Sequence, residues 1–111
     1  MIPDPSPPFE LDASGQIRDR IRIMLERAGE RGFHSEIARV IATILDHLIS
    51  NPRGWGDPLW HYYALQMTRY GGIEGRFRCE YSVHDRIPTV VLIDLIPLPG
   101  NPLYGENFDP Q

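Results

Sequence analysis

The chain has 111 residues, of which 41% are hydrophobic, with a formal net charge of −4 and one cysteine. This length predicts a single domain with one core, and no run approaches the roughly 18 apolar residues of a membrane-spanning helix. The single cysteine excludes an intramolecular disulfide and the N-terminus lacks the features of a secretory signal, so a cytoplasmic location and no membrane partner are expected. All basic residues are arginine, and the acidic balance argues against a general nucleic-acid binder.

The first half of the chain predicts two helices. Apolar residues recur at helical spacing over 17–28, after two candidate caps, Asp12 and Ser14. A second apolar stripe follows, which Ser35 is expected to cap and which ends before Pro52. The connection between the two stripes is short, so the helices are expected to lie antiparallel.

The second half predicts three strands joined by turns. Residues 59–70 are rich in aromatic side chains, and the glycine-rich segment 71–75 is expected to turn the chain. The segment 76–83 alternates between apolar and polar side chains, as a half-buried strand does. The segment 88–96 is the most apolar, which is typical of a strand covered on both faces. From Pro97 onward, prolines preclude a regular ladder of hydrogen bonds.

These elements predict an α+β fold in which two antiparallel helices pack on a small twisted antiparallel sheet. The expected organisation is a flexible Pro-rich arm over 1–8, a single domain over 9–98 that begins with a very short strand, and a Pro- and Gly-rich tail over 99–111.

The alternating segment carries the clearest candidate site. The residues expected to face the core are Phe77, Cys79, Tyr81 and Val83, and those expected to face outward are Arg76, Arg78, Glu80 and Ser82. Two guanidinium groups on one strand face can hold a phosphate or a carboxylate. Alternatively, Glu80 or an acid on a neighbouring strand neutralises them.

Three segments resemble the RelE/ParE superfamily of toxins from type II toxin–antitoxin (plasmid stabilisation) systems. They read LDHLISNPRGWGDPL, GRFRCEYSVHD and TVVLIDLIPLPGNPLY. The second segment is similar to the superfamily strand of the form aromatic-Arg-apolar-x-Tyr-x-Val, and the third to the Val- and Ile-rich strand after it. The resemblance covers about residues 9–98. The ribonuclease members of the superfamily cleave mRNA on the ribosome.

The resemblance implies roles for individual residues. Arg78 matches the superfamily arginine that contacts the scissile phosphate, and Arg76 is expected to assist it. The candidates for proton transfer are Glu80, His84 and Tyr104. The second basic residue that usually follows the last strand has no counterpart, because this chain has Pro97-Leu98-Pro99 there.

Other residues leave two interpretations open. Asp94 lies within the most apolar strand and is expected to share a face with Val90 and Leu92. It is either a general base or a partner of Arg78 or Arg76 across the sheet. His61 is either an acid–base group or a strand-edge residue. The aromatic side chains either stack on bases or form a packed cluster; they are Trp55, Trp60, Tyr62, Tyr63 and Tyr70.

No cofactor and no metal are expected. The chain has no P-loop, no dinucleotide-binding glycine pattern and no nucleophile elbow. His34 and His47 are too far apart in the sequence to form a metal-ligand motif, and Cys79 is expected in the core.

Two functions are therefore open. The first is a toxin-like component of a type II toxin–antitoxin system that acts as a ribosome-dependent mRNA endonuclease, with an antitoxin, RNA and the ribosome as partners. The second is a catalytically inactive or diverged interaction module of the same superfamily, antitoxin-bound or homodimeric, or a gyrase-directed toxin. The missing basic residue and the net charge of −4 favour the interaction module, with the strand 59–70 or the first helix as the docking surface.

Overall fold

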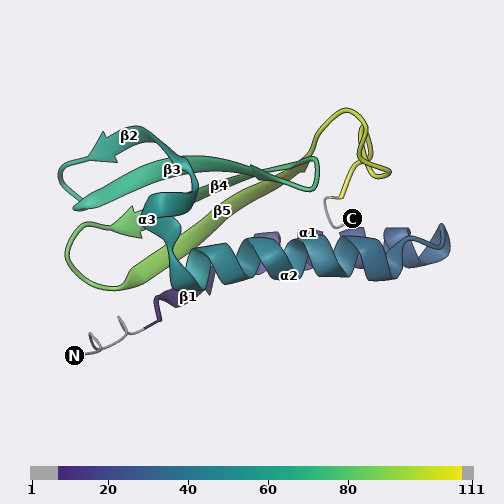
Figure 1. The fold of residues 1–111 in the computed structure, drawn as a ribbon, viewed down its shortest axis with the longest axis horizontal. Helices are drawn as coiled ribbons and strands as arrows, with labels where there is room; N and C mark the ends of the chain where they lie inside the picture. The colour runs from purple at the N-terminus through teal and green to yellow at the C-terminus, as the bar shows by residue number, and fades with distance from the viewer. Residues whose placement is uncertain (1–7, 109–111) are drawn as a thin grey trace, which may run out of the picture.

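A five-stranded sheet and two long helices make up most of the molecule (Figure 1). The computed structural model describes residues 8–108. The elements in chain order are β1 (Glu10–Ala13), α1 (Gly15–Glu30), α2 (His34–Ser50), α3 (Pro52–Trp55), β2 (Asp57–Tyr62), β3 (Met67–Glu74), β4 (Phe77–His84) and β5 (Thr89–Pro97).

Both predicted long helices are present, but only one has the predicted cap. The Ser14 hydroxyl accepts a hydrogen bond from the backbone N–H of Ile17, which satisfies one free donor at the start of α1. Helix α2 begins one residue before the predicted cap Ser35, and its N-cap residue Phe33 makes no side-chain hydrogen bond. The stability of α2 therefore depends on its apolar face, which buries Ile37, Ile41, Ile44 and Leu48.

The sheet differs from the predicted one. Its strand order is β1-β5-β4-β3-β2, and β1 runs parallel to β5 while the other neighbours are antiparallel. The prediction of a small antiparallel sheet with two helices is therefore wrong, because the described chain has a five-stranded mixed sheet and a third, short helix. Helices α1 and α2 pack toward the β1–β5 edge (Figure 1), where α1 contacts β5 and α2 contacts β1.

The extra strand arises because the segment 59–70 folds as a hairpin. A turn that includes Gln66, with a backbone φ of 52°, separates β2 from β3. Strand β3 then continues through Gly71 and Gly72, which were predicted to lie in the turn. The chain turns only at Gly75 and Arg76, whose φ angles are 54° and 59°, as in a two-residue hairpin loop with positive φ at both positions.

The core lies between the helices and one face of the sheet. The predicted inward face of β4 is confirmed, since Phe77, Cys79, Tyr81 and Val83 are all buried. The C-terminal segment contributes Leu103 and Phe108 to the same core. The predicted arm over 1–8 falls outside the described residues except for its last position. Over 8–108, no helix has the length and apolar character needed to cross a membrane.

Candidate functional site

The candidate site lies on the sheet face that is turned away from the buried side chains of β4. We call it the open face. Its apolar members are Leu59, Tyr62, Leu65, Met67, Ile73, Val91 and Ile93, and its charged members are Asp57, Arg69, Arg78 and Glu80. Helices cover the opposite face, so these side chains meet solvent or a binding partner.

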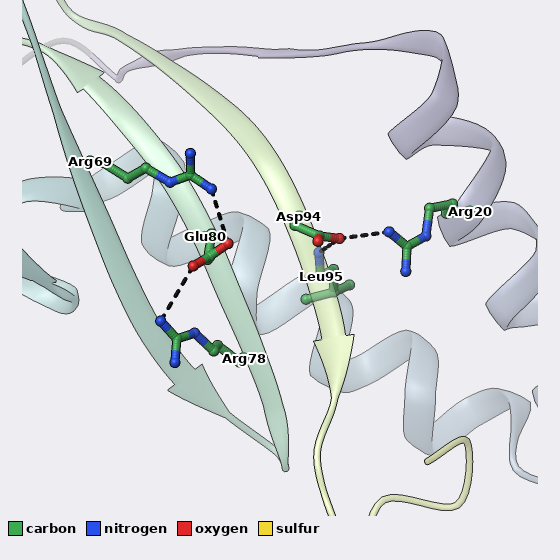
Figure 2. A network of polar contacts seen from close by, with 6 residues as sticks. All are labelled: Arg20, Arg69, Arg78, Glu80, Asp94 and Leu95. Carbon is green, nitrogen blue, oxygen red and sulfur yellow. Dashed lines mark hydrogen bonds and ion pairs between the residues drawn. The ribbon is translucent and has the colours of Figure 1, made fainter. Parts of the chain in front are cut away.

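Glu80 lies at the centre of the charged residues of the open face (Figure 2). Its Oε2 accepts a hydrogen bond from Arg69 Nη2 at 3.0 Å, and its Oε1 accepts one from Arg78 Nη2 at 3.3 Å. The pKa of Arg69 is raised, first by its side-chain hydrogen bond with Tyr62 and then by Glu80. The alternative in which Glu80 neutralises the strand-face arginine is thus the observed one, and it involves Arg69 as a second arginine.

Arg76 does not join this cluster. It lies in the turn before β4, and its guanidinium donates to the backbone oxygen of Pro99 at 3.5 Å. The expectation that Arg76 and Arg78 lie on one strand face is therefore wrong, because the left-handed backbone at Arg76 breaks the alternation that continues from Phe77.

Asp94 pairs with a helix and not with an arginine of the sheet. Its Oδ1 lies 2.8 Å from Arg20 Nη1 of α1 (Figure 2). A β-bulge near Glu80 places Asp94 opposite Glu80. Asp94 therefore does not share a face of the sheet with Leu92, as the alternation had predicted. Strand β1 pairs with β5 only as far as Leu92, so the edge of β5 beyond that point is open to Arg20.

The remaining predicted catalytic residues lie at opposite ends of β4. The Nδ1 of His84 accepts hydrogen bonds from the backbone N–H groups of Arg86 and Ile87 in the turn after β4. Tyr104 lies beyond the other end, in the segment anchored where the Asn101 side chain donates to the Arg76 carbonyl oxygen. The eight residues of β4 span about 23 Å. Of the five predicted residues, the structure therefore joins only Arg78 and Glu80.

A His–Asp pair that the sequence did not indicate lies at the end of the sheet near His84. His61 Nε2 is 2.7 Å from Asp85 Oδ2, and the Thr68 hydroxyl donates to Asp85 Oδ1 at 3.0 Å. The His61 hydrogen bond is the largest of the contacts that lower the pKa of Asp85. His61 belongs to β2 and Asp85 to the β4–β5 turn, so no local spacing could have revealed the pair.

This pair predicts a pH dependence of stability. The pKa of Asp85 is lowered in the folded state. The ionised carboxylate therefore stabilises the fold at pH values above the unfolded pKa, and this stabilisation is lost as the pH falls through the lower, folded pKa. We expect the stability difference between the wild type and Asp85→Asn to shrink steadily below about pH 4. Urea denaturation at several pH values measures this, with Asp46→Asn on the exposed side of α2 as the control. A difference that does not change with pH would contradict the assignment.

Two of the five aromatic side chains, Trp55 and Tyr70, belong to a packed cluster, whereas Trp60 and Tyr63 are largely exposed. The Trp55 ring lies between His47 at 4.8 Å and Tyr81 at 5.7 Å, and Tyr81 also stacks on Tyr70 at 5.3 Å, as centroid distances. Burial raises the pKa of both Tyr81 and Cys79 to about 12. Cys79 is thus a neutral core thiol, as predicted.

Two hollows open on either side of the charged cluster. The first has a volume of about 240 Å³, and its apolar lining is Tyr62, Leu65, Met67, Val91 and Ile93, with Arg69 and Ser82. The second has a volume of about 160 Å³ and is lined by Asp57, Leu59, Gly71, Ile73 and Arg78. The open face therefore combines apolar depressions with a central group of charges.

The comparisons with known proteins provide no assignment. No family model matches the chain, and no curated protein matches it. Within residues 8–108, no group of three or more His, Cys, Asp or Glu side chains is placed to hold a metal ion. A function must therefore be inferred from the geometry of the open face.

Proposed function

We propose that the protein is an interaction module that binds another protein chain through its open face, and that it does not cleave RNA. The observation that carries this proposal is that Arg69 and Arg78 both pair with Glu80 beside a hollow whose lining is mostly apolar. A phosphate would have to compete with a carboxylate that is already in place. Burial of an apolar protein surface against the same face is favourable, and it does not require the Glu80 carboxylate to be displaced.

The exposed apolar side chains support a protein partner. Among the large hydrophobic residues of the open face, the exposed fractions are 47% for Leu59, 63% for Leu65 and 66% for Ile73. Trp60, on the neighbouring edge strand, is 62% exposed. Apolar side chains grouped in this way on a soluble domain mark an interaction site, and aromatic side chains are enriched in the centres of protein interfaces.

The arrangement of the predicted catalytic residues argues against a nuclease. General acid–base catalysis needs proton donors and acceptors within hydrogen-bond reach of one substrate atom. His84 is the last residue of β4, Tyr104 lies beyond the other end of that strand, and Arg76 contacts Pro99 instead of the open face. The net charge of −4 further reduces the attraction of RNA.

The resemblance of the β4 sequence to RelE/ParE toxins suggests two kinds of partner. One is an antitoxin chain, since toxins of that superfamily are held by such chains, and the other is a second copy of this protein. Both would bury the open face, and both leave Arg78 in contact with protein and not with phosphate.

Site-specific photo-crosslinking in the producing cell tests the proposal. A photoreactive phenylalanine analogue replaces Leu65, which lines the larger hollow, and a control places it at the exposed Arg39 of α2. We expect a protein adduct of one defined mass from position 65 and none from position 39. An RNA adduct from position 65, or equal adducts from both positions, would contradict the proposal.

Induction in a bacterial host gives a second prediction. We expect the wild-type chain to cause no growth arrest and to cleave no mRNA on purified ribosomes, and Arg78→Ala to behave identically. Glu80→Gln should raise RNA affinity several-fold, because it removes the carboxylate that both arginines contact. Growth arrest by the wild type that Arg78→Ala relieves would instead support the endonuclease.

A further inference from the structure

The charges of the open face form a chain of alternating sign. Arg69 contacts Glu80, Glu80 contacts Arg78, and Arg78 lines the smaller hollow together with Asp57. Two positive and two negative groups therefore follow one another across the face, with no net charge. A strongly acidic or strongly basic partner would find as much repulsion as attraction on such a surface.

Apolar surface borders this charge chain on both sides. The larger hollow, with Leu65 and Met67, lies on the side of Arg69, and the smaller hollow, with Leu59 and Ile73, lies on the side of Arg78. Gly71 has no side chain, so the smaller hollow reaches the Arg78 guanidinium, whose Nη2 lies 3.8 Å from the position of a Cβ on Gly71. Arg78 can thus be contacted from outside as well as by Glu80.

A pattern of this kind is complementary to itself. If a second copy is rotated by 180° about an axis between Arg78 and Glu80, the Arg78 of each copy faces the Glu80 of the other. A two-fold contact repeats every favourable pair twice, and the apolar borders on each side meet as well. The exposure of Arg78, 46% of its side chain against 27% for Arg69, makes it the arginine that is available for a second carboxylate.

We infer that the open face binds a second copy of this chain in a two-fold symmetric dimer, with Arg78 of each protomer paired to Glu80 of its partner. This inference rests on the proposed function, because it names the partner of the same surface. A different protein chain as the occupant would retain the proposed function and overturn the dimer.

Sedimentation equilibrium of the full chain and of two charge-reversal variants tests the inference. We expect the wild type to dimerise with a dissociation constant below about 1 mM. Arg78→Glu and Glu80→Arg should each self-associate with a dissociation constant at least tenfold higher. An equimolar mixture of the two variants should form a one-to-one dimer, since each then supplies the charges that the other lacks. Circular dichroism confirms that each variant is folded.

Two controls separate this interface from other causes. Arg22→Glu reverses an exposed arginine on α1, and we expect it to dimerise as the wild type does. Leu65→Asp leaves the charge chain intact and places a carboxylate in the larger hollow, so it should also weaken the dimer at least tenfold. A monomeric wild type, a mixture that fails to associate, or equal weakening by Arg22→Glu would overturn the inference.

Discussion

Replacing Tyr81 with alanine is expected to lower the free energy of unfolding by about 3–5 kcal/mol, the range for removal of a large buried aromatic side chain. Tyr81 is fully buried, and its ring stacks on Tyr70 and on Trp55. Its hydroxyl donates to the Pro52 carbonyl oxygen at 2.6 Å and accepts from the Gly56 N–H at 2.9 Å. The side chain therefore fastens the α3 segment to the centre of the sheet.

Tyr81→Phe separates the two contributions. It retains the ring and leaves the Pro52 oxygen and the Gly56 N–H without this partner, which costs about 1–3 kcal/mol. Urea denaturation followed by circular dichroism measures both variants against the wild type. A loss below 1 kcal/mol in Tyr81→Ala would show that Tyr81 does not hold α3 on the sheet.

Local periodicity was sufficient to predict the inward face of β4, although Ser82 on the other face is buried as well. The alternation from Phe77 to Val83 is a property of a single strand, since successive side chains point to opposite faces whatever their neighbours are. The apolar stripes of the two long helices are local in the same sense. The cap at Ser14 depends on a hydrogen bond that spans three residues, so it too could be predicted.

The sheet itself could not be predicted because its pairings are not local. The parallel pairing of β1 with β5 joins segments about eighty residues apart, and nothing in either segment specifies it. Gly71 and Gly72 read as a turn, since glycine is the usual turn residue. Both lie within β3, and a Cβ on Gly72 would lie 2.8–3.0 Å from the Trp55 ring, a contact between distant segments that local sequence does not show.

The candidate site was only half predictable for the same reason. Arg78 and Glu80 lie two apart on one strand, so their contact follows from the alternation. Arg69, the second arginine on Glu80, comes from β3, and Arg20, the partner of Asp94, comes from α1. A single bulge in the β4–β5 ladder changes the face on which Asp94 emerges, and no residue type in that segment marks the bulge.

Gly72→Ala is expected to destabilise the fold by about 1–3 kcal/mol, the range for overpacking a core. A Cβ at this position would lie 2.8–3.0 Å from three atoms of the Trp55 ring. That ring cannot move aside easily, because it is held between His47 and Tyr81. The backbone of Gly72 does not have a positive φ, so the expected loss comes from this contact and not from backbone strain.

Gly71→Ala is the matched control on the opposite face of the same strand. A Cβ there would lie 3.1 Å from the tip of Leu59, an exposed side chain that can rotate away. Alanine also restricts the unfolded chain, which favours folding by about 0.4–1 kcal/mol, so we expect Gly71→Ala to change stability by no more than about 1 kcal/mol. Thermal and urea unfolding, with tryptophan fluorescence as a probe of Trp55, compare the two variants. Equal losses of stability in the two variants would mean that neither glycine of the strand tolerates a side chain. The contact with Trp55 would then not be the reason for glycine at position 72.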